Sequence, residues 1–205
     1  IKYMSKAVAN ELYELSQTNT YQSFSDLLYD ISHKTSVDSR QLEILIKIDF
    51  FSDFGNQREL FAINDIFEMF KKGEAKQIKK DRIDGTQFEE IVKRYANGKT
   101  KKGEEAKSYT LLDVMAIIRE CEAKLKTLGV NDLSIPLKAK NFKDIMGYAG
   151  YVSGRETDRN KLLITGVYPV RRKKDNKVFG YSVLTQSIGS GKGSRMTVFK
   201  RKFDK

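Results

Sequence analysis

Hydrophobic positions along the chain change from a helical to a strand-like pattern. Over residues 1–70, apolar side chains recur every three or four positions, which is the spacing of one buried helix face. Ser5 and Asp38 precede two of these runs, and their side-chain oxygens can accept hydrogen bonds from the free amides of a first helical turn. Four short helices are therefore predicted, over residues 6–15, 24–31, 39–54 and 57–70.

The middle of the chain has a weaker pattern. Residues 71–107 are rich in Lys, Glu and Gly, which is typical of a mobile or loosely packed connector, with one helix near residues 88–95. An amphipathic helix is predicted over residues 111–128, and Gly129 would end it.

Apolar and polar residues begin to alternate after Asn141, as they do in strands with one buried face. Four strands are predicted, over residues 147–152, 161–170, 177–185 and 195–201. Helices followed by strands favour an α+β fold built as separate modules. We expect an all-α module over 1–70, a charged connector with an amphipathic helix over 71–135, and a small antiparallel β module over 136–205.

Net charge is concentrated at the C-terminal end. Residues 155–205 hold 14 Lys and Arg against 4 Asp and Glu, so they carry +10 of the net charge of +11. A field of one sign favours a polyanionic partner, because each cation set against a phosphate releases condensed counterions. Aromatic residues lie among these charges, unlike in a disordered basic tail. They are Tyr168, Phe179, Tyr181, Phe199 and Phe203.

Rings and cations in these strands predict a nucleic-acid-binding surface. Small five-stranded barrels hold single strands with aromatic side chains that stack on bases and with cationic loops that follow the phosphates. The alternative, that the rings of Phe179, Tyr181 and Phe199 all belong to a hydrophobic core, stays open. The predicted nucleic-acid-binding residues are Arg171, Arg172, Lys173, Lys174, Lys177, Phe179, Tyr181, Lys192, Arg195, Phe199, Lys200 and Arg201.

No catalytic centre is evident. The segment Gly189–Gly193 lacks both the first glycine and the Ser or Thr of a Walker A loop. With one Cys and one His, no zinc set is present, and no converging carboxylates suggest metal-assisted phosphoryl transfer. We therefore expect neither a cofactor nor a metal. There is no apolar run long enough to span a membrane and no signal peptide, which predicts a cytoplasmic protein.

One run of residues resembles a known family. Residues Val37 to Gly55, followed by Asn56-Gln57-Arg58, are similar to a signature of the alpha subunit of bacterial DNA polymerase III, the C-family replicative polymerase. Ser23-Phe24-Ser25-Asp26-Leu27 resembles an upstream element of that family. Leu163 to Val167 and Lys177 to Tyr181, with Val198-Phe199, resemble the OB-fold that follows it. At Ile1 to Val8, Tyr3 and Ser5 replace the two glycines of the family's first hairpin.

The resemblance implies a C-terminal part of that polymerase, excised from a longer chain. It implies tandem helix-hairpin-helix elements over 1–70 that hold duplex primer-template DNA, with Ser39, Arg40 and Lys47 as DNA contacts. It implies an OB-like module near the single-stranded template. Four strands are predicted where such a barrel has five, so its completeness stays open. The polymerase's catalytic carboxylates have no counterpart, so this part would bind DNA without synthesising it.

A sliding clamp is a further partner implied for the full-length protein, because Gln57-Arg58-Glu59-Leu60-Phe61 fits the family's clamp-binding pattern. The predicted helix over the same residues favours a packing role instead. Two other classes of function stay open. One is a stand-alone RNA- or single-strand-binding module, and the other is a helix-hairpin-helix nuclease or glycosylase, which would need a carboxylate or Lys in a cleft.

Overall fold

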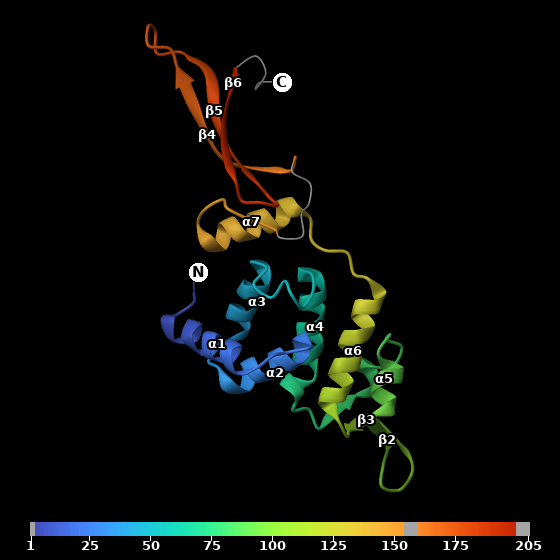
Figure 1. Cartoon of the computed structure of the whole chain (residues 1–205). Helices are drawn as coiled ribbons and strands as arrows, with labels where there is room; N and C mark the ends of the chain where they lie inside the picture. Colours follow the sequence, from blue (N-terminus) through green and yellow to red (C-terminus); the bar gives the residue numbers. More distant parts are fainter. Residues whose placement is uncertain (1–2, 154–159, 200–205) are drawn as a thin grey trace. The chain divides into compact units, whose positions relative to one another are not determined.

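The computed structural model describes residues 3–153 and 160–199 (Figure 1). Within these residues the chain forms seven α-helices and two three-stranded antiparallel sheets, so the α+β class is confirmed. The chain divides into an N-terminal unit, Tyr3–Leu133, and a C-terminal unit that begins at Ser134. None of the described helices is long and apolar enough to cross a bilayer.

Six helices belong to the N-terminal unit, and local capping signals fix where most of them begin. The predicted N-caps Ser5 and Asp38 are confirmed, with side chains that accept hydrogen bonds from the amides of Val8 and Gln41. The helices are α1 (Lys6–Thr18), α2 (Phe24–Lys34), α3 (Ser39–Lys47), α4 (Gln57–Met69), α5 (Glu89–Arg94) and α6 (Val114–Leu128).

Helix α3 is shorter than predicted. It ends at Lys47, and Ile48–Phe54 forms consecutive turns, with Asp49 at φ 61°. Phe50, which the periodicity placed on the buried stripe, is 56% exposed, while its neighbour Phe51 is buried. The predicted C-terminal stop of α6 at Gly129 is confirmed, since this residue is left-handed at φ 64°.

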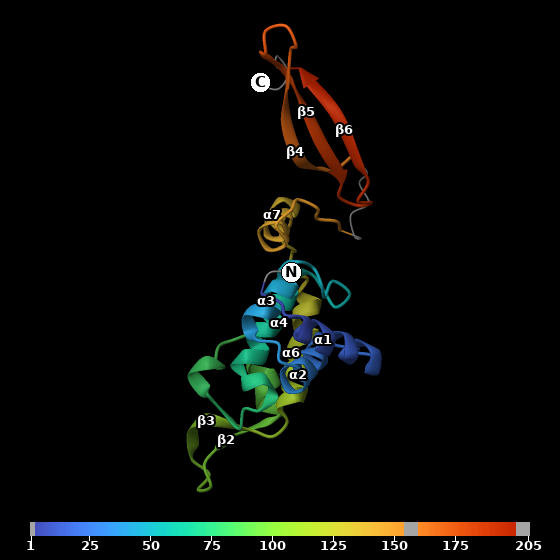
Figure 2. The same cartoon turned by 90° about the vertical axis from the view of Figure 1, so that its left-hand side faces the viewer.

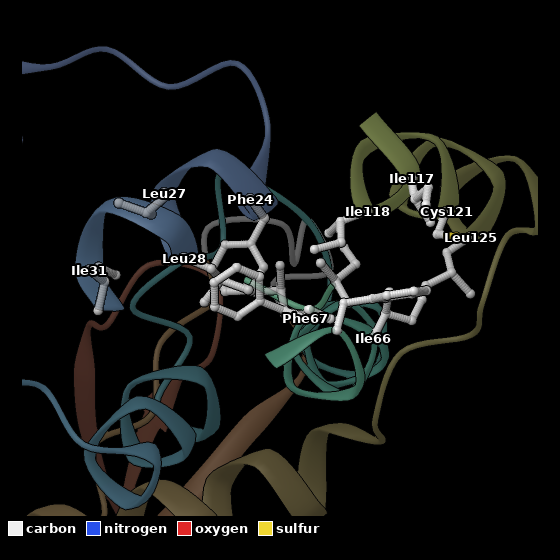
Figure 3. Close-up of a cluster of buried hydrophobic side chains, with 14 of the residues drawn as sticks. Phe24, Leu27, Leu28, Ile31, Ile66, Phe67, Ile117, Ile118, Cys121 and Leu125 are labelled. Carbon is white, nitrogen blue, oxygen red and sulfur yellow. The ribbon is translucent and has the colours of Figure 1, made fainter. Parts of the chain in front are cut away.

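The core of the N-terminal unit lies where α2, α4 and α6 meet (Figure 3). Phe24 of α2, Phe67 of α4 and Ile118 of α6 point toward one another and are at most 1% exposed. The three helices lie far apart in the sequence. Packing their apolar surfaces together removes those surfaces from water, so the helices stabilise one another.

Residues 71–107 differ from the predicted connector. They form short 3-10 turns (Lys71–Gly73 and Lys80–Arg82) and, with the residues that follow, a sheet of strand order β1-β3-β2, made of β1 (Gln77–Lys79), β2 (Ala96–Lys99) and β3 (Glu105–Leu111). Ile78, Ile83, Ile91 and Val92 are buried in the main core. The few apolar residues of this charged segment are therefore structural, and its Lys and Glu residues form the solvated face.

The C-terminal unit begins with a helix that the sequence analysis missed. Helix α7 (Ile135–Met146) has Pro136 in its first turn and ends at Gly147, at φ 82°. The predicted strand over 147–152 is wrong: these residues form no strand, and Tyr151 instead packs with Ala139 and Ile188 in a second small core.

Three strands follow α7, namely β4 (Leu162–Arg171), β5 (Val178–Ser187) and β6 (Gly193–Phe199), paired in the order β4-β5-β6 (Figure 2). The register shifts between Ile164 and Gly166, and again between Val170 and Arg171. These irregularities decide which side chains share a face, because successive residues of a strand point to opposite sides.

Candidate nucleic-acid interface

One face of the β4-β5-β6 sheet, which we call the ring face, presents Tyr168, Ser182, Arg195, Thr197 and Phe199. Tyr168, Ser182 and Thr197 lie opposite one another in one row across the three strands. Phe199 lies in the next row toward the β4–β5 hairpin, opposite Gly180. Residues paired directly across an antiparallel sheet share a face, so both rings lie on the same side.

The two rings of this face stand on opposite edge strands. Tyr168 is 57% exposed and Phe199 is 59% exposed. The central strand carries Gly180 and Ser182 between them, and these small residues leave the middle of the face low. The rings are separated by two strand spacings, about 10 Å, plus one step along the strands. A chain lying along β5 would therefore pass between two aromatic surfaces.

Two glycines allow this arrangement. A Cβ on Gly166 would come within 2.8 Å of the Tyr168 ring, so the ring lies over the bare backbone of its own strand. A Cβ on Gly180 would come within 2.8 Å of the carbonyl oxygen of Val198, so a side chain there would force β5 and β6 apart beside Phe199.

Arg195 is held in a fixed position on the ring face. It pairs with Leu184, and its Nε donates a hydrogen bond of 2.6 Å to the hydroxyl of Ser182. Arg195 remains exposed, whereas Ser182 is buried. This bond uses the inner nitrogen of the guanidinium, so the planar fork formed by the two terminal nitrogens is oriented before any ligand arrives.

A shallow groove of about 620 Å³ lies next to Arg195. Leu184 and Gln186 of β5 contribute side chains to its lining, and Gly193 contributes backbone alone. The groove is lined by Ala149, Thr165, Leu184, Thr185, Gln186, Gly191, Gly193, Ser194 and Arg195.

A cluster of cations, the basic hairpin tip, lies at the turn between β4 and β5, at the end of the sheet remote from α7 (Figures 1 and 2). All five of its cationic side chains are exposed. Backbone hydrogen bonds close the turn, from the Arg172 amide to Lys177 O and from the Asn176 amide to Arg172 O, each 2.9 Å. The cluster consists of Arg171, Arg172, Lys173, Lys174 and Lys177.

Alternation along the strand predicts that Phe179 and Tyr181 lie on the same face of the sheet, but a register shift at Phe179 breaks this pattern. Phe179 lies at the register shift, and its ring centroid is 6.4 Å from that of Phe199. Tyr181 lies between Pro169 and Val198 on the side opposite the ring face. That opposite side is apolar, with exposed Leu162, Ile164, Val167 and Met196. Tyr168, which the sequence analysis noted but did not assign to the site, takes the place expected for Tyr181.

The three remaining predicted cations lie outside the basic hairpin tip. Lys192 is exposed in the β5–β6 loop, at the opposite end of the sheet from the basic hairpin tip. Lys200 and Arg201 lie outside the described residues.

The predicted DNA contacts of the N-terminal unit are engaged within that unit. The Ser39 hydroxyl lies 3.5 Å from a carboxylate oxygen of Glu68, and the Arg40 guanidinium lies 3.9 Å from the centre of the Tyr3 ring. Lys47 Nζ forms an ion pair of 3.1 Å with Glu43.

The N-terminus of α3 is closed by its own residues. The Asp38 carboxylate accepts a hydrogen bond from the Gln41 amide, and the Gln41 side chain bonds back to the Asp38 amide. A carboxylate at this position repels a phosphate, which would otherwise be attracted by the free amides of the first turn.

The segment that fits a clamp-binding pattern lies in the first turns of α4, as its periodicity predicts. Gln57 and Leu60 are at most 1% exposed, and Gln57 Nε2 donates to the Lys47 carbonyl oxygen. These side chains pack the N-terminal unit.

Compared with protein-family models, with curated proteins and with solved structures, the chain gives no significant match. Across the described parts of the chain, no three His, Cys, Asp or Glu side chains gather where they could hold a metal ion. Function is therefore inferred from the chemistry of the ring face.

Proposed function

We propose that the ring face of the β4-β5-β6 sheet binds single-stranded nucleic acid. The observation that carries this proposal is the placement of two exposed rings, Tyr168 and Phe199, on one face of a sheet that also holds an oriented Arg195 and ends in the basic hairpin tip. Aromatic rings stack on unpaired bases of any sequence, and cations follow the backbone.

Single strands suit this surface better than a duplex. Stacking on a protein ring requires an unstacked base, and the bases inside a duplex are already stacked on each other. The row of Arg195 and the row of Phe199 are four residues apart along the strand, about 13 Å, which is enough for a few nucleotides of extended chain.

Charge supports the same assignment. Residues 134–205 contain 17 Lys and Arg against 5 Asp and Glu, whereas residues 1–133 contain 21 against 22. A polyanion is therefore attracted to the unit that carries the rings. The resemblance to the polymerase alpha subunit predicts that the strand is DNA near a primer-template junction, and an RNA strand is the alternative that direct comparison tests.

The first experiment measures affinity by fluorescence anisotropy with labelled single-stranded DNA, single-stranded RNA of the same sequence, duplex DNA and primer-template DNA. We expect single strands to bind more tightly than the blunt duplex. Stacking contributes about 1 to 3 kcal/mol per base, so Tyr168→Ala and Phe199→Ala should each weaken binding roughly 5- to 150-fold. The matched control is Tyr13→Ala, which removes an equally exposed tyrosine from α1.

Losses no larger than that of the Tyr13 control would contradict the proposal, as would equal affinity for the blunt duplex. Tighter binding of RNA than of DNA would still support single-strand binding by the ring face, but it would contradict the DNA partner implied by the resemblance to the polymerase.

A second experiment tests the basic hairpin tip through salt dependence. Lys173→Ala with Lys174→Ala should flatten the plot of log affinity against log salt by up to about 0.7 per cation, the value expected for single strands. Adding Arg171→Ala and Arg172→Ala should roughly double that change. The control pair Lys101→Ala with Lys102→Ala removes the same charge from the β2–β3 loop. Equal slopes in the tip and control variants would exclude the tip from the interface.

A further inference from the structure

The groove next to Arg195 has chemistry that stacking and phosphate attraction do not require. Its lining combines the apolar side chains of Ala149 and Leu184 with the Gln186 amide and the hydroxyls of Thr165, Thr185 and Ser194, while Gly191 and Gly193 add no side chain. Tyr168 is not part of the lining, but its ring lies over Gly166, the residue paired with Leu184, so an aromatic surface lies beside the groove.

Arg195 presents a directional donor to this groove. Because its Nε is bonded to Ser182 at 2.6 Å, the rotation of the guanidinium is restricted and its two terminal nitrogens are left for a ligand. Such a fork matches a partner with two adjacent acceptor atoms in one plane. Guanine is a base that offers such a pair, in the O6 and N7 atoms of its Hoogsteen edge, and arginine is the residue that most often recognises it.

We propose that the Arg195 groove binds one guanine base, with the Hoogsteen edge of the base on the Arg195 fork and its face near Leu184 and Tyr168. This inference rests on the proposed binding of single strands, and it adds a base preference to a surface that would otherwise be indifferent to sequence. Ser182 acts as a positioning residue, because it touches Arg195 and orients the fork.

A phosphate also has adjacent acceptor atoms, so the two sources of this chemistry must be separated. A phosphate is tetrahedral and strongly hydrated, and it gains nothing from Leu184 or from the Tyr168 ring beside the groove. A planar base gains from both. These two contacts favour the base over the backbone, whereas the polar side chains of the lining can bond either.

The test uses the full chain and thymine oligonucleotides of about 12 nucleotides, each with one central replacement. The replacements are guanine, adenine, 7-deazaguanine, which lacks the N7 acceptor, and an abasic sugar. We expect the guanine strand to bind roughly 10-fold more tightly than the all-thymine strand. The 7-deazaguanine and abasic strands should lose that advantage.

Arg195→Lys keeps the charge and removes the fork. It should reduce the guanine preference by a larger factor than it reduces the affinity for the all-thymine strand. Ser182→Ala should reduce the preference without removing it. Arg82→Lys is the matched control at an exposed position of the N-terminal unit and should leave the preference intact. Unchanged circular dichroism confirms that each variant is folded.

The possible outcomes are distinct. A guanine preference that both Arg195→Lys and 7-deazaguanine reduce supports the inference. Equal binding of all the strands, a preference that is undiminished in Arg195→Lys, or full retention of affinity by the abasic strand would overturn it and assign Arg195 to a phosphate. Failure of every strand to bind would instead refute the proposed function.

Discussion

Replacing Glu122 with Gln should strongly destabilise the N-terminal unit. Glu122 belongs to α6 and is 2% exposed, and its carboxylate closes the N-terminus of α2. One oxygen accepts from the Phe24 amide at 2.9 Å, and the other accepts from the amide and hydroxyl of Ser25 at 2.8 and 2.5 Å. Lys126 lies 2.7 Å from the first oxygen.

The magnitude follows from what an amide can replace. The side chain of the Glu122→Gln variant would keep one acceptor oxygen, but its NH₂ group would face donors on the other side, which leaves at least one buried donor unpaired. An unpaired buried donor costs about 1 to 3 kcal/mol, and the remaining bonds lose the strength that a charged acceptor provides. We expect a loss of about 3 kcal/mol in the free energy of unfolding, well above the effect of an ordinary surface substitution.

The effect should also depend on pH. Burial alone would raise the pKa of Glu122, but the hydrogen bonds from Lys126, Ser25 and Phe24 outweigh it and hold the pKa below its ordinary value of 4.5. A carboxyl whose pKa is lower in the folded state stabilises the fold above its unfolded pKa, and this contribution is lost as the pH falls through the folded value. The difference between the wild type and Glu122→Gln should therefore be constant near neutral pH and shrink below 4.5.

Urea unfolding followed by far-UV circular dichroism measures this difference, and hydrogen exchange at the Phe24 and Ser25 amides locates it at α2. Glu14→Gln is the control, because Glu14 is exposed on α1. A Glu122→Gln variant as stable as this control would refute the reasoning, and so would a difference that stays constant down to about pH 3.

Two further predictions concern single positions. Gly180→Ala should destabilise the β5–β6 pairing by about 1 to 3 kcal/mol, since its Cβ would lie 2.8 Å from the Val198 carbonyl oxygen. Amide hydrogen exchange in β5 measures this effect, with Gly193→Ala as the control because its Cβ would lie 3.8 Å from the nearest atom. Equal exchange rates in the two variants would contradict the prediction. Cys121 is fully buried, and burial is the main cause that raises its pKa to about 12. A thiol reagent should therefore modify it only after unfolding. Rapid modification of the native protein at neutral pH would contradict this prediction and show that this part of the core opens readily.

Local signals predicted much of the helical part of the fold. Ser5, Asp38 and Gly129 mark helix ends through their own side chain or backbone, and the structure confirms all three. Phe50 was misplaced because its spacing continued the stripe of α3 beyond the turn at Asp49. Periodicity shows which positions share a face, but it does not show where a helix stops when no glycine or proline marks the end.

The sheets depended on information that is not local. Ile78 and Val92 are buried because residues distant in the sequence cover them. Their sequence neighbours are mostly charged, so the local composition did not predict this burial. Tyr151 has strand-like neighbours, yet it packs against α7. For short segments, tertiary contacts outweigh intrinsic preference.

The sequence predicted the positions of the cations in the candidate site better than the positions of its aromatic rings. The cations at Lys173 and Lys174 stand in the exposed turn that the sequence indicated. The position of Tyr168 on the same face as Phe199 depends on strand register and on an irregularity near Thr165, and neither is visible in the alternation of a single strand.

The turn that carries the basic hairpin tip is closed by main-chain atoms, from Arg172 to Lys177 and from Asn176 to Arg172. Arg171 also helps to close the turn, because its guanidinium donates a hydrogen bond of 3.0 Å to the Asn176 carbonyl oxygen. The side chains of Arg172, Lys173 and Lys174 can vary without loss of these bonds. Substitutions there can tune how strongly the protein holds a polyanion at a given ionic strength, while folding is left to residues elsewhere. Except at Arg171, the attraction of a polyanion and the closure of the turn depend on different atoms of the same short segment.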